Sequence, residues 1–151
     1  MDVIFIGMLV ILVDQITKHL IQMNMDPYTS IPVIKNIFHI TYVQNTGAAF
    51  SILKGKTLFF SVVSLVIVFA IIMILIKYPI KRRLSRMVFA SILGGAIGNL
   101  IDRIRFGYVV DFIDFRVWPV FNIADCAIVI GVSALAYLII FDPELETLFN
   151  K

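Results

Sequence analysis

Four long apolar segments constrain this chain more than any other feature of its sequence. They cover approximately residues 3–23, 57–76, 84–103 and 122–141. Each is close to the ~20 mostly apolar residues that a helix needs to cross a bilayer. Because backbone polar groups in lipid must be satisfied within the segment, such stretches cross as helices. The sequence therefore predicts an integral membrane protein, mainly α, built as a four-transmembrane-helix bundle.

The composition supports this interpretation. Of the 151 residues, 60% are hydrophobic and only 15% are charged, which is more apolar than an ordinary globular domain. The formal net charge of +3 is therefore interpreted by its position along the chain. It does not indicate nucleic-acid binding. We expect a single membrane domain over residues 1–151 and no nucleic acid among its partners.

The densest basic cluster predicts the orientation in the membrane. Five Lys and Arg side chains fall within the short connection at residues 77–86. Short loops rich in Lys and Arg face the cytoplasm. We therefore expect this loop and both termini on the cytoplasmic side. Residues 24–56 and 104–121 are then expected on the outer face.

Both outer segments contain patterns typical of strands. Phe38, Ile40 and Tyr42 alternate with His39, Thr41 and Val43 in a period of two rich in aromatic and β-branched residues, as in a strand. A turn is indicated at residues 45–47. Residues 108–113 alternate in a similar way. The sequence predicts a small β-rich subdomain on the outer face.

Polar side chains within the apolar segments gather in one layer. An ionised side chain at membrane depth is costly unless it is paired, hydrated or used. With the orientation above, the outer halves of the first, third and fourth segments contain Asp14, Lys18, Asn99, Asp102, Arg103, Asn122 and Asp125. The second segment has nothing stronger than two serines. This layer is the candidate functional site.

Two groups in this layer have structural interpretations beside functional ones. Asp14 and Lys18 are four residues apart on one helix face, so they can neutralise each other. We favour a buried ion pair that orients the first helix over a direct chemical role. Asn99, Asp102 and Arg103 also share a helix face. They form either a packing network or a set that positions a carboxylate and a substrate backbone, and both can hold.

The remaining carboxylates also leave alternatives open. Asn122 followed by Asp125 resembles an N-terminal helix cap. Asp111 and Asp114 can be ordinary loop carboxylates. From the residues alone, these interpretations stand level with a catalytic pair formed by Asp111 and Asp125.

Small residues predict which helices pack together. Stripes of this kind let helix backbones approach closely. They comprise Ala90, Gly94 and Gly98 in the third segment, and Ala124, Ala127, Gly131 and Ala134 in the fourth. We expect the third and fourth helices side by side, which would bring Asp125 near the loop that contains Asp111.

Five motifs, in order and between four apolar segments, link the chain to a known family. They are DQITK, VQNTGAAFS, GGAIGNLIDR, GYVVDFID and FNIAD. With them the chain closely resembles, over essentially its whole length, the bacterial lipoprotein signal peptidases, also called signal peptidase II or prolipoprotein signal peptidase.

The resemblance implies a membrane aspartic endopeptidase that removes the signal peptide from prolipoproteins. Such an enzyme cleaves before a diacylglyceryl-modified cysteine, with two aspartates activating water. The catalytic pair would be Asp111 and Asp125. The substrate-binding or supporting residues would be Asp14, Lys18, Asn45, Gly47, Asn99, Asp102, Arg103 and Asn122. Asp114 is expected to be a supporting residue.

The resemblance also sets the expected partners and place. The partners are diacylglyceryl-modified prolipoproteins and membrane lipid. No metal and no other cofactor is expected, and the protein is expected to be a monomer. It would be a multi-pass protein of the bacterial cytoplasmic (inner) membrane, with its active site near the outer face.

Two other functions compete with this one. Intramembrane acids also mark proton and ion pathways, so the alternative is a small proton- or ion-translocating membrane protein. A pathway needs polar residues at several depths, whereas here they stop in the outer half. A structural assembly factor would use the carboxylates only for folding.

Overall fold

The computed structural model of the chain describes residues 2–47 and 56–142. The last residues of the VQNTGAAFS motif, part of the expected outer segment 24–56 and the tail of the expected domain therefore lie outside the described residues.

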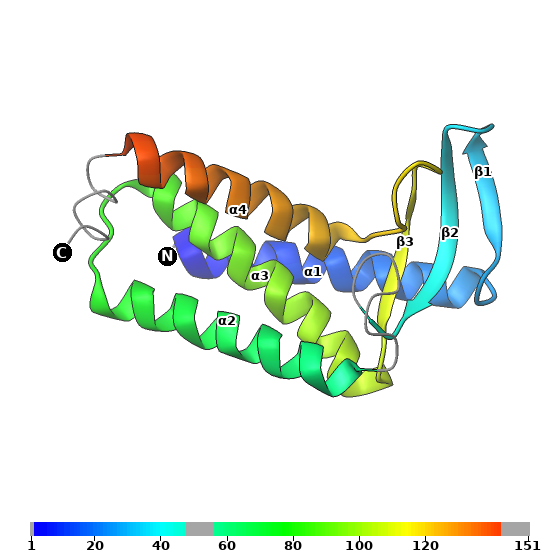
Figure 1. Ribbon diagram of the computed structural model, residues 1–151, viewed down its shortest axis with the longest axis horizontal. Helices are drawn as coiled ribbons and strands as arrows, with labels where there is room; N and C mark the ends of the chain where they lie inside the picture. The colour runs from blue at the N-terminus through cyan, green and yellow to red at the C-terminus, as the bar shows by residue number, and fades with distance from the viewer. Residues whose placement is uncertain (1, 48–55, 143–151) are drawn as a thin grey trace.

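Four helices form the body of the protein (Figure 1). They are α1 (Asp2–Asn24), α2 (Thr57–Lys77), α3 (Arg83–Phe106) and α4 (Ile123–Phe141). All four are long and apolar enough to cross a membrane, which takes about 20 mostly apolar residues. The predicted mainly α, four-helix architecture is confirmed.

Helix α3 extends beyond the approximate span predicted for it at both ends. The helix continues to Phe106, three residues past residue 103. Gly107 ends the helix because it adopts a left-handed φ of 77° and its N–H donates to the Arg103 carbonyl at 3.0 Å, a common C-terminal cap. At the other end α3 begins at Arg83, so only residues 78–82 connect it to α2.

A three-stranded antiparallel sheet lies at one end of the helices (Figure 1). Its order is β1–β2–β3, with β1 at Ser30–Ile34, β2 at Phe38–Asn45 and β3 at Val109–Asp114. Strands β2 and β3 confirm the two predicted extended segments. Strand β1 was not predicted. It is an exposed edge strand that contains Pro32, a residue that argues against a strand unless it lies at a sheet edge.

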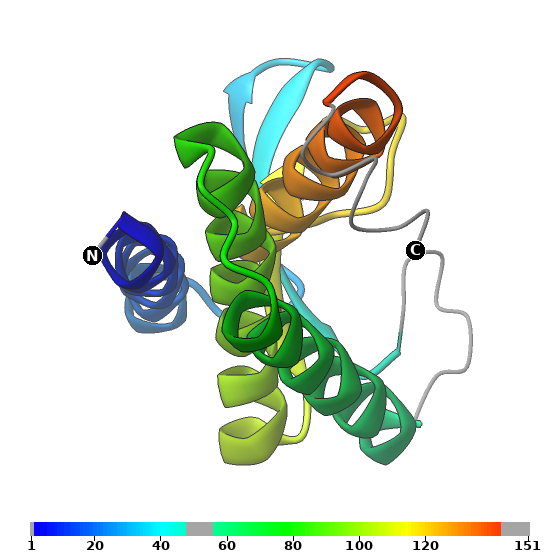
Figure 2. The same cartoon turned by 90° about the vertical axis from the view of Figure 1, so that its left-hand side faces the viewer.

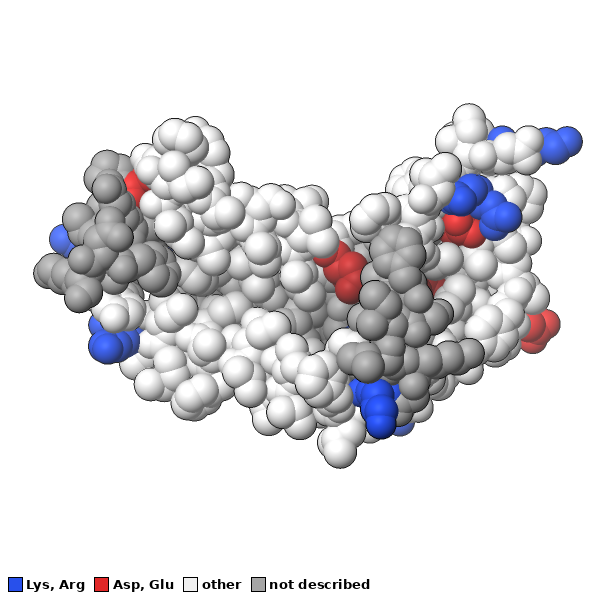
Figure 3. Space-filling model, in the orientation of Figure 1, with Lys and Arg blue, Asp and Glu red and all other residues white. Residues whose placement is uncertain are grey.

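Helix α3 lies at the centre of the bundle and packs against each of the other three helices (Figure 2). An apolar core lies toward the 78–82 connection and includes Ile71, Phe89, Ile92 and Leu138. The face shown in Figure 3 is mostly uncharged over the helices. Acidic atoms appear there in a hollow between helices and sheet.

The small-residue stripes pack differently from the prediction. Helices α3 and α4 do lie side by side, but α3 uses Gly95 for this contact, where an added Cβ would lie 2.5 Å from the Ala124 carbonyl. A Cβ on Gly94 would instead lie 2.8 Å from the Gly7 carbonyl of α1. The stripe of residues 90, 94 and 98 therefore faces mainly α1. Both faces of α3 place helix backbones in close contact.

Candidate active site

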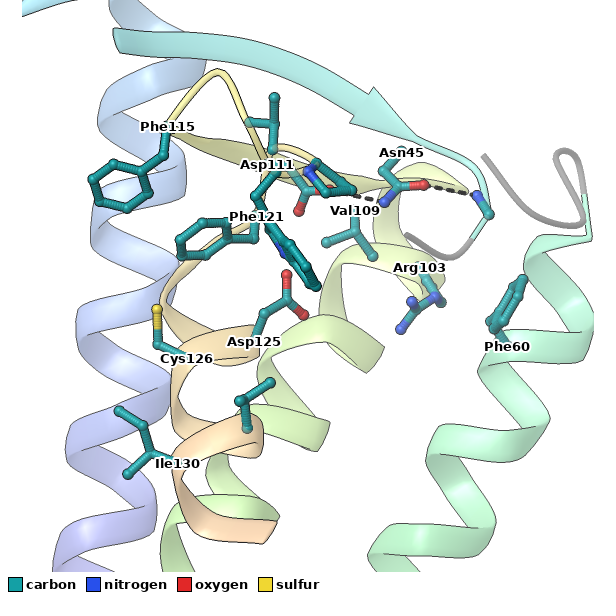
Figure 4. A pocket seen from close by; sticks show the side chains of 15 residues that line it. Asn45, Phe60, Arg103, Val109, Asp111, Phe115, Phe121, Asp125, Cys126 and Ile130 are labelled. Carbon is teal, nitrogen blue, oxygen red and sulfur yellow. Dashed lines mark hydrogen bonds between the residues drawn. The ribbon is translucent and has the colours of Figure 1, made fainter. Parts of the chain in front are cut away.

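Asp111 and Asp125 come from different elements and share one pocket. Asp111 lies in the middle of β3 and is 2% exposed, whereas Asp125 lies in the first turn of α4 and is partly exposed. Both line a pocket of about 660 Å³ between the sheet, α3, α4 and α2. Figure 4 shows their carboxylates directed toward the same part of this pocket.

Three asparagines donate hydrogen bonds to the two carboxylates. Asp111 accepts from the Asn122 side chain at 2.7 Å and from the Asn45 side chain at 2.8 Å. Asp125 accepts from the Asn99 side chain at 2.7 Å and from the backbone N–H of Asn122 at 3.2 Å. Each of the four carboxylate oxygens therefore has one N–H donor, which fixes the orientation of both acids.

Other donors fix the orientation of these asparagines. The amide oxygen of Asn45 accepts from the backbone N–H of Gly47 at 2.9 Å. The amide oxygen of Asn99 accepts from Lys18 Nζ at 3.0 Å and from the Asn122 side chain at 3.1 Å. Since an amide has its acceptor and donors on opposite sides, these bonds turn the NH₂ groups toward the aspartates.

The cap interpretation of Asn122 and Asp125 is also correct. Asn122 precedes α4, and its side-chain oxygen accepts from the backbone N–H of Asp125 at 2.9 Å. Asp125 accepts in return from the backbone of Asn122, which completes a capping box and satisfies exposed N–H groups of the first turn. The same two residues thus start the helix and position a carboxylate in the pocket.

A buried ion cluster lies behind the asparagines. Lys18 Nζ lies 2.8 Å from an Asp14 oxygen and 3.0 Å from an Asp102 oxygen, which confirms the predicted Asp14–Lys18 contact. Sequence reasoning missed Gln15, whose side chain donates to Asp102 at 2.9 Å and to the Gly98 carbonyl at 3.2 Å. Its position next to Asp14 in the DQITK motif was the available signal.

Arg103 lies at the rim of the pocket beside α2. Its guanidinium is 3.3 Å from the Ser64 hydroxyl and 5.8 Å from the centre of the Phe60 ring. Within the part of the chain that the structure describes, no carboxylate lies within ion-pair distance of it. Figure 4 shows the group between Phe60 and the aspartates. Arg103 therefore has N–H donors available to a bound molecule.

Burial changes the acidity of Asp111. Removal from water raises the pKa of Asp111 to about 7, and the nearby charge of Asp125 acts in the same direction. Hydrogen bonds from Asn45 and Asn122 oppose the rise. Because desolvation disfavours the charged form of a carboxyl group, Asp111 is positioned to hold a proton near neutral pH.

Asp114 has a different place from Asp111. It accepts from the Thr41 hydroxyl at 2.7 Å and from the backbone and guanidinium of Arg116 at 2.8 Å and 3.0 Å. It does not line the pocket. Asp114 thus stabilises the turn after β3. The segment that this turn begins contributes Phe115, Trp118 and Phe121 to the pocket wall, a role that the sequence did not predict.

Most of the pocket wall is apolar. Beside the three residues just named, it includes Phe60 of α2 and Val129 of α4. Over residues 2–47 and 56–142 no group of three or more His, Cys, Asp or Glu side chains is placed to hold a metal ion. The described pocket combines two carboxylates and a guanidinium with apolar walls, an arrangement suited to an amphiphilic ligand.

The sequence of the chain matches a known protein family. The family model described as signal peptidase (SPase) II matches residues 6–141. The chain belongs to the signal peptidase II family. Its relatives include a lipoprotein signal peptidase of Halothermothrix orenii, 52% identical over 145 residues, which are 94% of this chain and 97% of that protein. Another, from Caldanaerobacter subterraneus subsp. tengcongensis, is 54% identical over 133 residues, covering 87% of this chain and 91% of that protein.

Solved structures related to this signal peptidase II family member have the same fold. Two bacterial membrane enzyme structures, each 36% identical, superpose with TM-scores of 0.86 and 0.83. The first comparison covers 93% of this chain and 88% of the other, and the second covers 93% of each. The chain is therefore a multi-pass membrane protein of a peptidase family, and the resemblance in its motifs is confirmed.

Proposed function

We propose that this protein is an aspartic endopeptidase that removes the signal peptide from prolipoproteins, cleaving before the diacylglyceryl-modified cysteine. The family supports the removal of signal peptides from prolipoproteins. The observation that supports the aspartic mechanism is the pair Asp111 and Asp125, two carboxylates that face one pocket and are each held by N–H donors.

The two aspartates divide the work of hydrolysis. One ionised carboxylate takes a proton from water, and the water oxygen attacks the carbonyl carbon of the scissile bond. The other, protonated, carboxyl group donates to the carbonyl oxygen. When the tetrahedral intermediate breaks down, the C–N bond breaks and the nitrogen receives a proton from the pair. Close carboxylates of low solvent access share one proton, and the pair titrates as a unit.

The remaining predicted residues support this chemistry. Asn45, Asn99 and Asn122 orient the aspartates through the hydrogen bonds described above. Arg103 binds carbonyl oxygens of the substrate at the rim. Gly47, which lines the pocket, holds Asn45 and contacts the substrate.

The pocket suits a substrate that is both lipid and peptide. Its apolar walls receive the acyl chains and the apolar part of the signal peptide, while the aspartates meet the peptide bond. We place this site near the outer face of the bacterial cytoplasmic membrane, with both termini in the cytoplasm. There the protein acts as a monomer on its prolipoprotein within the surrounding lipid, without a metal.

An ion pathway is the weaker alternative. A pathway requires polar groups at successive depths. Among the described residues, the buried cluster of Asp14, Lys18 and Asp102 forms one layer behind the pocket. The buried Asp142, paired with the half-exposed Arg82, forms another layer at the opposite end. Apolar side chains such as Phe89 and Ile92 lie between these layers.

The purified protein should cleave a diacylglyceryl-modified prolipoprotein peptide. The same peptide with an unmodified cysteine should be cleaved at least about 100-fold more slowly, because it makes no acyl-chain contacts with the pocket walls. Each buried CH₂ group of an acyl chain contributes about 0.8 kcal/mol. Product formation is followed by mass spectrometry with and without a chelator. Equal cleavage of both peptides would refute the lipid requirement, and inhibition by chelator would refute the metal-free mechanism.

Cysteine labelling tests the orientation. Lys81 and Lys35 are both exposed but lie at opposite ends of the molecule, in the 78–82 connection and beside β1. In a Cys126→Ala background, Lys81→Cys should resist a membrane-impermeant maleimide in intact cells, and Lys35→Cys should react. The basic connection faces the cytoplasm under the positive-inside rule. The reverse labelling pattern would overturn the proposed topology.

A further inference from the structure

Each candidate catalytic aspartate is preceded by a residue whose backbone N–H donates to a buried carboxylate. Asp14 of α1 accepts a hydrogen bond from the backbone N–H of Ala124 at 2.9 Å, the residue before Asp125. Asp102 of α3 accepts from the backbone N–H of Val110 at 3.0 Å, the residue before Asp111. One carboxylate thus fixes the start of α4, and the other fixes β3.

Lys18 joins these two carboxylates. Its ammonium lies 2.8 Å from Asp14 and 3.0 Å from Asp102, and these three side chains are at most 2% exposed. The ammonium also donates to the amide oxygen of Asn99 at 3.0 Å, whose NH₂ group reaches Asp125. An ammonium has three N–H donors, and here each has an acceptor. Because all three N–H groups bond to protein acceptors, the position of the ammonium is fixed.

We infer that Lys18 is a positioning residue that sets the separation between Asp111 and Asp125 by drawing the carboxylates of Asp14 and Asp102 together. This inference rests on the proposed function of the aspartate pair. The two aspartates repel each other whenever both are charged. Strand β3 and α4 are joined by the segment 115–122 and by hydrogen bonds from the Asn122 side chain to Asp111 and to the Val110 carbonyl. The Lys18 clamp, defined as Lys18 with Asp14 and Asp102, opposes that repulsion from behind.

The charges of the clamp provide a matched variant. Two carboxylates and one ammonium sum to −1. In Lys18→Met the two remaining carboxylates lie close together without a counterion and repel each other. The double variant Lys18→Met/Asp102→Asn keeps the sum at −1 and retains a side-chain oxygen that can accept from Val110. It therefore removes the Lys18 connection between the two arms without changing the net charge behind the pocket. The Gln15 side chain, which donates to Asp14 at 3.3 Å and to Asp102 at 2.9 Å, is unaltered.

The experiment measures kcat, KM and the pH dependence of cleavage for the full-length protein with a diacylglyceryl-modified peptide. In the double variant we expect kcat to fall about 100-fold, the effect of displacing reacting groups by about 1 Å. KM should change less than about threefold, because Arg103 and the apolar walls are unaltered.

The pH profile separates positioning from simple loss of stability. Nearby carboxylates ionise at well-separated pH values because the first charge opposes the second. If the aspartates move apart, the acid limb of the pH–rate profile should shift to higher pH and the alkaline limb to lower pH. The pH range over which the enzyme is active therefore narrows. Loss of positive charge alone would move both limbs upward, as expected in part for Lys18→Met.

Asp142→Asn is the control for removing the charge of a buried carboxylate that has an ion-pair partner, here the half-exposed Arg82. Asp142 is buried at the opposite end of the bundle, where it pairs with Arg82 and accepts from Ser85. This variant should lower the melting temperature while kcat and the width of the pH profile stay unchanged. If Lys18→Met/Asp102→Asn behaves in the same way, Lys18 is only structural and the inference is overturned.

The outcome also distinguishes the inference from the proposed function. If Asp111→Asn and Asp125→Asn still cleave, the aspartate mechanism itself fails. If these variants are inactive while the double clamp variant has a normal pH profile, only the role of Lys18 fails. Asp102→Asn alone is a milder change and should narrow the pH profile by a smaller amount. If the double variant does not fold, this single variant takes its place in the test. An unchanged pH profile in Asp102→Asn would then refute the clamp.

Discussion

Replacing Asp111 or Asp125 with asparagine is expected to slow cleavage of the diacylglyceryl-modified substrate by about 10⁴-fold or more, the upper end for loss of a general acid or base. Asparagine has nearly the shape of aspartate but neither accepts a proton from water nor donates one as an acid. Cells that contain only such a variant should accumulate uncleaved, lipid-modified prolipoprotein. The purified assay gives the rate, and normal processing by either variant would reject the pair.

A matched carboxylate and a stability measurement complete this test. Asp26 is exposed on the connection between α1 and β1, so Asp26→Asn should cleave normally. The pKa of Asp111 is raised by burial from 3.8 to about 7. The stability that its protonated form contributes is therefore complete below about pH 3.8 and lost as pH rises through about 7. Asp111→Asn lacks this loss, so its melting temperature at pH 8 should equal or exceed that of the unaltered protein.

The second large effect is expected from one methyl group at Gly95. A Cβ there would lie 2.5 Å from the Ala124 carbonyl and 2.8 Å from the Ile128 side chain. Helix α4 must therefore move away from α3 and take Asp125 with it. We expect Gly95→Ala to lower kcat about 100-fold through misplacement of the pair. Overpacking should also cost about 1–3 kcal/mol of stability.

Gly7→Ala is the matched control for this substitution. Its added Cβ would have the Ala90 carbonyl as its nearest neighbour, at 3.6 Å, an ordinary contact. Because alanine has the higher helix propensity, this variant should be as stable and as active as the unaltered protein. Thermal unfolding and the cleavage assay measure both variants. Unchanged kcat in Gly95→Ala would show that the close approach of α3 and α4 does not position Asp125.

The helices could be predicted because bilayer thickness imposes their length. Each apolar segment had to be close to the thickness of the hydrocarbon core, and the structure places the helix ends within three residues of the predicted ones. Strand β1 lacked such a constraint. Its pairing with β2 depends on tertiary contact, and Pro32 conceals it in the sequence.

The candidate site residues were recognisable, but their connections were not. Asn45 and Asp111 are 66 positions apart and meet only because β2 pairs with β3. No periodicity predicts that Asp14 caps α4 or that Gln15 reaches Asp102, since both contacts follow from the approach of α1 to α3. The motifs predict which side chains matter, whereas the fold determines which of them touch.

The exposed part of the pocket wall has a kinetic consequence. Apolar side chains such as Ile71 and Leu138 join the core near the 78–82 connection. Toward the sheet, Val129 and Ile130 of α4 line the pocket while remaining 64% and 68% exposed, so this wall opens sideways onto lipid. A prolipoprotein can then arrive by diffusing in the plane of the bilayer. Its effective concentration is its mole fraction among the lipids, so adding inert lipid or detergent at constant volume dilutes it.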